Sequence, residues 1–153
     1  MPATSAHPAL KAIFWGGLLA GVGDFIFAHC FYGWKLGVFQ NVAGGLLGKE
    51  AARAGGVPTF VLGTTLHFLI AFIWAAIFWG LSRRLPFLLR HAIPAGLLYG
   101  LMIYLAMSGV VVPLSALHAP MRLPPLLAWP AAAHLLLVGL PIALAEKKHS
   151  HTP

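Results

Sequence analysis

The sequence predicts an all-α polytopic membrane protein: four transmembrane helices in one bundle, a single domain over residues 1–153. Two observations lead to this fold class. Charged residues make up only 8% of the chain and hydrophobic residues 59%, whereas an ordinary soluble domain carries about 25% charged residues. The hydrophobic residues also gather in four long apolar stretches, which cover residues 12–32, 59–81, 92–112 and 123–145.

Each stretch is long enough to cross a bilayer, because a spanning helix needs about 20 mostly apolar residues. The strands of a membrane barrel would instead alternate apolar and polar residues over about 10 positions. These stretches are apolar on every side, so helices are expected. Prolines mark their ends: Pro94 opens the third helix and Pro113 closes it, Pro124 and Pro125 open the fourth, and Pro130 and Pro141 kink the fourth.

The connection at residues 33–58 is too long for a turn. Its apolar residues recur at helical spacing opposite Gln40, Asn41 and Glu50, and they are Leu36, Phe39, Val42, Ala43, Leu46 and Leu47. This pattern predicts a short amphipathic helix on the outer membrane face. Several glycines weaken the pattern, so a re-entrant or irregular segment is the alternative. Residues 146–153 are expected to form a polar, solvated C-terminal tail.

The distribution of cations predicts that both termini lie in the cytoplasm. With four spans the termini share one side, and that side holds six cations: Lys11, Arg83, Arg84, Arg90, Lys147 and Lys148. The other side holds four, which are Lys35, Lys49, Arg53 and Arg122. Cytoplasmic loops carry the excess of Lys and Arg.

Several classes of function are disfavoured. The net charge is +7, but the cations are scattered singly or in pairs, so the lipid bilayer rather than nucleic acid is the expected partner. The single cysteine, Cys30, excludes an internal disulfide. The chain shows no recognisable catalytic nucleophile, phosphate-binding loop or acid pair, and we expect neither an enzyme nor a resident cofactor.

Asp24 is the most informative residue, because a carboxylate within a span costs about 2.5–3.5 kcal/mol on insertion scales. At 1.5 Å per residue, His67 and His134 fall at nearly the same depth as Asp24, in the outer half, with His29 nearer the surface. These residues predict a protonatable ion or proton site. The competing interpretation is that each residue makes only a structural hydrogen bond between helices.

Other functions use the same residues. A small dimeric exchanger of drugs or cations for protons would use Asp24 as its carboxylate. The small-residue pairs Gly17/Gly21 and Gly96/Gly100 indicate close helix packing, and secondarily the seam of a homo-oligomer. A zinc or iron site, or haem held by His67 and His134, is a further alternative. The last alternative is a protein that only binds a partner and carries out no chemistry.

The order of these features resembles the YagU-like group of small bacterial inner-membrane proteins. The resemblance rests on a glycine-rich first helix, the Leu66-His67-Phe68 sequence, the Gly96 and Gly100 helix running into Val112-Pro113-Leu114, and His134 in the fourth helix. The third-helix histidine of that group is missing here, and its outer loop differs. The resemblance implies four helices and a role for the histidines at low pH, in acid or envelope stress.

Overall fold

The computed structural model describes residues 8–120, 125–126 and 128–150, and this part of the chain is helical without any strand. Four helical segments are long and apolar enough to cross a membrane: Pro8–Tyr32, Gly56–Arg84, Ala92–Leu114 and Trp129–Ser150. The first two are the continuous helices α1 and α4. The predicted all-α architecture of four spans is therefore confirmed.

The third and fourth segments each contain a π-helical turn. The third consists of α6 (Ala92–Ala106), η1 (Met107–Val111) and α7 (Val112–Leu114). The fourth consists of α8 (Trp129–Ala133), η2 (His134–Gly139) and α9 (Leu140–Ser150). The short helix α5 (Phe87–Arg90) connects α4 to α6.

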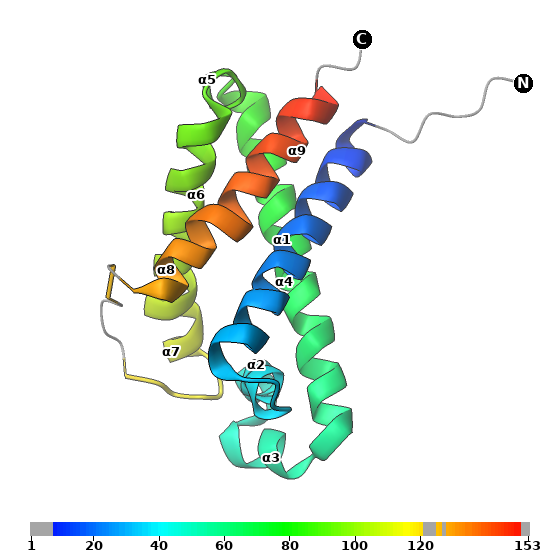
Figure 1. The fold of residues 1–153 in the computed structure, drawn as a ribbon, viewed down its shortest axis with the longest axis vertical. Helices are drawn as coiled ribbons and strands as arrows, with labels where there is room; N and C mark the ends of the chain where they lie inside the picture. The colour runs from blue at the N-terminus through cyan, green and yellow to red at the C-terminus, as the bar shows by residue number, and fades with distance from the viewer. Residues whose placement is uncertain (1–7, 121–124, 127, 151–153) are drawn as a thin grey trace, which may run out of the picture.

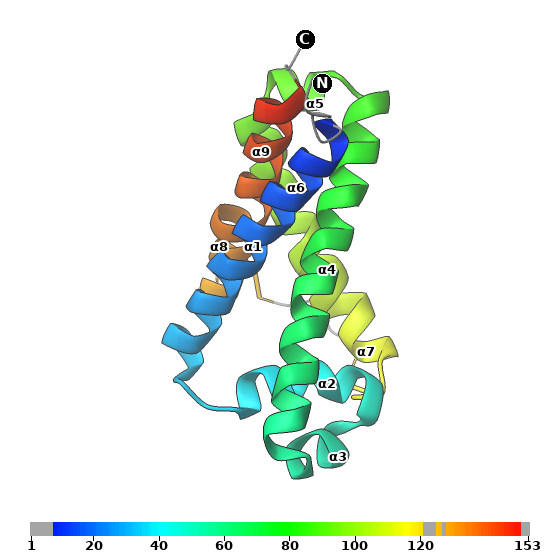
Figure 2. The ribbon, with the colours of Figure 1, turned by 90° about the vertical axis from the view of Figure 1, so that its right-hand side faces the viewer.

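The bundle places α1 between α4 and α9, and places α9 with η2 between α1 and α6 (Figures 1 and 2). The start of α1 and the end of α9 lie at the same end of the bundle, next to α5 (Figure 1). We call this the terminal end. The helices α2 and α3 lie at the opposite end (Figure 1), which we call the distal end.

The connection after α1 does contain a helix, but its buried face differs from the predicted one. The helix α2 (Gly37–Leu47) packs against α4, and α3 (Lys49–Ala54) follows it. Phe39 and Ala43 are buried as expected, while Leu46 and Leu47 are exposed. Gln40, expected on the polar face, is buried because its side-chain amide donates to Gly56 O (2.8 Å) and Thr59 Oγ1 (3.3 Å).

Pro94 lies in the first turn of the third segment as predicted, whereas Pro113 and Pro125 do not mark the predicted helix ends. The third segment continues through Pro113 to Leu114 instead of ending there, and the fourth segment starts at Trp129, after Pro125. Both π turns end two residues before a proline, Pro113 or Pro141. A proline ring clashes with the carbonyl four residues earlier and lacks an N–H donor, so a wider turn relieves the clash.

The expected polar tail is also helical as far as its residues are described. The helix α9 continues to Ser150, and Glu146 is 2% exposed. The helix persists because the Glu146 carboxylate finds donors on α4 and on its own next turn. The predicted span start at 123 and the residues Arg122, Pro124 and His151 lie outside the described part of the chain.

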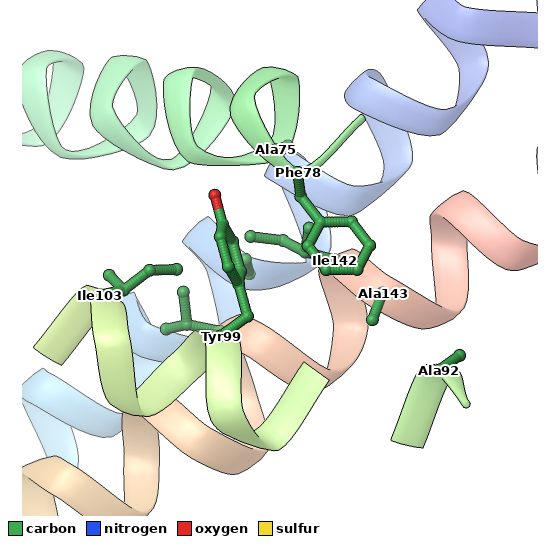
Figure 3. Packing of buried hydrophobic residues seen from close by; sticks show 9 residues of the cluster. Ala75, Phe78, Ala92, Tyr99, Ile103, Ile142 and Ala143 are labelled. Carbon is green, nitrogen blue, oxygen red and sulfur yellow. The ribbon is translucent and has the colours of Figure 1, made fainter. Parts of the chain in front are cut away.

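The core lies on the terminal side of the bundle centre. It contains Phe78 from α4, Tyr99 and Ile103 from α6, and Ile142 from α9, packed among small residues. Tyr99 extends from α6 with its hydroxyl directed toward α4 (Figure 3), where it donates a 2.7 Å hydrogen bond to Trp74 O. This layer of large side chains fills the space between α4 and α6.

Candidate functional site

The structure brings three of the four predicted site residues to one cavity. Asp24 from α1, His67 from α4 and His134 from η2 line a cavity of about 180 Å³ on the distal side of the core. Its other walls are apolar and come from six elements; they are Ala20, Val42, Ile70, Ala71, Trp74, Ile103, Met107 and Val138. Three ionisable side chains therefore share a small apolar space inside the bundle.

Asp24 and His67 form a pair across the contact between α1 and α4. The distance from His67 Nδ1 to Asp24 Oδ2 is 3.9 Å, and the two side chains are 13% and 21% exposed, respectively. The other ring nitrogen, Nε2, lies 2.9 Å from Gly21 O. Because a carbonyl oxygen only accepts hydrogen bonds, Nε2 carries a proton and donates it. Nδ1 is then the atom that gains or loses a proton beside the carboxylate.

His134 has its ring oriented by its own helix. Its Nδ1 lies 2.8 Å from Pro130 O, one turn earlier, and donates to that carbonyl. The remaining nitrogen, Nε2, is therefore the acceptor in the neutral ring. His134 is also the first residue of η2, so the π turn sets how the ring meets the cavity wall.

His29 does not line the cavity. It is 4% exposed and lies within an aromatic group, with ring centroids 4.4 Å from Phe25, 4.6 Å from Trp34 and 5.1 Å from Phe39. Its Nδ1 donates to Phe25 O, 3.1 Å away. Phe39 separates it from His67, whose ring centroid lies 5.0 Å from that of Phe39. The structure thus gives His29 a packing environment.

The four predicted packing glycines lie at helix contacts within the chain. A Cβ at Gly17 or Gly21 would collide with the aromatic rings of α4, those of Phe72 and Phe68 respectively. On the other side, Gly96 and Gly100 of α6 meet the backbone of η2 and α9. Gly139 of η2 completes this contact, since its Cβ would collide with the backbone of Gly96 and Gly100. These contacts hold α4 and η2, and with them both histidines, in place.

A second cavity adjoins the first. It measures about 410 Å³ and lies between α2, α4 and the η1–α7 region. The two cavities share three lining residues: Val42, Ile70 and Met107. The larger cavity is mostly apolar, with Asn41 and Ser115 as polar exceptions. Apolar side chains thus separate the Asp24 cavity from an open chamber at the distal end.

Metal ligation has no geometric support in the described residues. In that part of the chain, no three His, Cys, Asp or Glu side chains lie close enough together to hold a metal ion. Asp24 and His67 form one close pair, and His134 meets them only across the cavity. The zinc, iron and haem alternatives stay predictions.

The sequence interpretation missed a buried acid, Glu146. Glu146 accepts hydrogen bonds from Ser82 (3.3 Å), Arg83 (3.1 Å) and Ser150. It follows Ile142 by four residues, and Ile142 is 1% exposed. Extending the helical register past residue 145 would have placed Glu146 on the buried face. This group lies at the terminal end, across the core from the Asp24 cavity.

No protein family model, curated protein or solved structure matches this chain. The resemblance to the YagU-like group therefore stays a prediction, and the site must be interpreted from its own geometry.

Proposed function

We propose that this chain is a membrane protein that binds and releases a proton at the Asp24–His67 pair, and that it acts in proton or ion handling. We place it in a bacterial inner membrane, where acid or envelope stress would engage the pair. The observation that carries the proposal is that Asp24, His67 and His134 line one shared cavity whose other walls are apolar. An ionisable residue within a membrane span is a functional site by default.

The geometry supports an exchange of charge at the pair. Nε2 of His67 keeps its proton on Gly21 O, so the exchangeable proton lies on Nδ1 or on the Asp24 carboxyl group. With that proton the pair is neutral overall, and without it the pair carries one negative charge. Apolar walls screen such a charge poorly. A departing proton is therefore best replaced by another cation, or by a proton taken up at His134.

The test follows the two ring nitrogens of His67 by NMR in the purified, histidine-labelled protein. We expect Asp24→Asn to change the chemical shifts of His67 Nδ1, because that atom loses the carboxylate that lies 3.9 Å away. His29→Gln is the matched control, since His29 lies outside the cavity, and it should leave the Nδ1 shifts of His67 nearly unchanged. Nδ1 shifts that do not respond to Asp24→Asn would overturn the proposed pair.

The physiological test uses the same pair. Cells that depend on the protein under acid challenge should lose internal pH control with Asp24→Asn and with His67→Ala. Wild-type survival and internal pH in both variants would remove the cavity residues from the function.

A second candidate function is proton-coupled exchange of a small organic cation. It is favoured by the 410 Å³ apolar chamber, which shares a wall with the Asp24 cavity. Such a chamber suits a lipophilic body, and the Asp24 carboxylate suits a cationic group. The expected result is resistance to toxic organic cations that Asp24→Asn abolishes and the exposed-acid control Glu50→Gln preserves. Resistance that does not depend on Asp24 would exclude this function.

A further inference from the structure

A groove of about 600 Å³ runs along the outside of the contact between α1 and the last segment, away from the Asp24 cavity. Its walls are apolar except at one end. The walls consist of Trp15 and Leu19 from α1, and of Leu136, Leu140, Pro141, Leu144 and Ala145 from the last segment. Lys148 and His149 also line it, at the terminal end.

Two glycines of α1 lie where the two helices meet below the groove. The helices run in opposite directions, and a Cβ at Gly16 would lie 3.4 Å from Ile142 Cα, in ordinary contact. A Cβ at Gly23 would lie 3.2 Å from Leu137 O. These two glycines are seven residues apart, so the close contact runs for about 10 Å along α1. Larger side chains on either side then form the walls.

The two walls follow regular helical spacing. On the last segment, Leu136, Leu140, Leu144 and Lys148 recur every four residues, which places them on one face. On α1, Lys11, Trp15 and Leu19 recur in the same way. From Leu136 to Lys148 the helix rises about 18 Å. That length fits an extended lipid chain lying along the bilayer normal.

A lysine lies at the terminal end of each helix that forms the groove: Lys148 lines the groove, and Lys11 lies one turn before Trp15. Lys11 precedes the Gly16–Ile142 contact by five residues, and Lys148 follows it by six. The two lysines therefore lie about 8 Å and 9 Å from that contact, in the same direction. Trp15, which is 45% exposed, sits one turn deeper, where an indole suits the boundary between headgroups and chains.

We infer that this groove binds one anionic phospholipid. The acyl chain lies between the leucine stripe of the last segment and the Trp15–Leu19 wall, and the lipid phosphate lies between Lys11 and Lys148. Basic pockets between transmembrane helices on the cytoplasmic side hold anionic headgroups in this way. The groove shares no lining residue with the cavity of the proposed function, so the test of the lipid site does not depend on proton binding.

The experiment counts lipids bound to the purified full-length protein by native mass spectrometry. The protein is stripped of lipid in detergent and titrated with phosphatidylglycerol or with phosphatidylcholine. The first phosphatidylglycerol should bind about tenfold or more tightly than phosphatidylcholine, as two lysines near a phosphate would give. The double variant Lys11→Gln/Lys148→Gln should bind both lipids equally.

The control carries the same charge change at the distal end, as Lys35→Gln/Lys49→Gln, and it should keep the full preference. Leu140→Trp fills the groove and should weaken both lipids. The inference is overturned if the Lys11/Lys148 variant keeps the preference, if both double variants lose it alike, or if Leu140→Trp binds lipid normally. Displacement of phosphatidylglycerol by millimolar inorganic phosphate would also overturn the inference, because it would show a site that binds only the phosphate group and no acyl chain.

Discussion

Glu146 and Arg83 form an ion pair, but the two side chains differ greatly in exposure to solvent. Glu146 is 2% exposed, whereas the Arg83 side chain is 46% exposed and also stacks over the Trp79 ring, 5.5 Å from its centroid. Arg83 can therefore turn to water if it loses its partner. Glu146 cannot, because the packing of α4 against α9 encloses it. Because Glu146 is buried and Arg83 is not, the loss of Arg83 should destabilise the protein more than the loss of Glu146.

This inequality predicts different costs for the two halves of the pair. Arg83→Gln leaves a buried carboxylate without its cation, so the free energy of unfolding should fall by about 3 kcal/mol. Glu146→Gln keeps an acceptor for Ser82 and Ser150, so the loss should be about 1 kcal/mol. Denaturant unfolding in detergent measures both, with Arg84→Gln as the exposed control. Equal losses for the two variants would contradict the predicted inequality.

At the scale of the elements, the contact between α6 and η2 depends on three glycines. A Cβ at Gly100 would lie 2.7 Å from Leu135 Cα, which is backbone that cannot rotate away. The two elements would have to separate. Because His134 and Val138 of η2 and Ile103 of α6 all line the cavity, that separation would also change the cavity.

We therefore expect Gly100→Ala to destabilise the protein by about 1–3 kcal/mol, the range for overpacking a tight contact. Gly80→Ala is the matched control, since a Cβ there, in the last two turns of α4, would meet nothing within 4 Å. It should stabilise the protein by about 0.4–1 kcal/mol. Thermal unfolding of both variants measures the difference. A neutral Gly100→Ala would show that α6 and η2 do not pack this closely.

The sequence predicted these elements unevenly, for physical reasons. The four spans follow from apolar length, which does not depend on the neighbouring helices. The placement of Gln40 on the polar face of α2 was wrong, because it is buried by partners 16 and 19 residues away, which local spacing does not show. Depth along the helices suggested the set Asp24, His67 and His134. Whether these three side chains face one cavity depends on how each helix is rotated about its own axis. In the last segment a π turn sets that rotation.

At the scale of the whole molecule, two polar groups lie on opposite sides of an apolar layer. Asp24, His67 and His134 occupy the distal side, and Glu146 with Arg83 the terminal side. The nine buried residues of the core cluster between them carry one polar side-chain atom, the Tyr99 hydroxyl. That hydroxyl donates its hydrogen bond to Trp74 O. Within these nine residues, therefore, no continuous chain of side-chain hydrogen bonds joins the two groups.

The orientation of the bundle gives a prediction at this scale. In a background with Cys30 replaced by serine, Lys49→Cys should react in intact cells with a maleimide that does not cross membranes. Lys147→Cys should react only after the membrane is opened, because the larger number of cations lies at the terminal end. Both positions are exposed in the structure. The reverse labelling pattern would place the termini outside the cell.

The apolar core layer around Tyr99, which we call the Tyr99 layer, also determines where a membrane voltage would act. Water and mobile charge conduct, so the electric field concentrates in the apolar layer that excludes them. Moving one elementary charge through the whole potential exchanges about 2.3 kcal/mol per 100 mV. A proton that reaches Asp24 from the distal end does not cross this layer, and its electrical work is limited to the part of the potential that falls across the apolar side chains between the two cavities. A proton driven on toward Glu146 would do most of it, so any voltage dependence of transport would report passage through the Tyr99 layer.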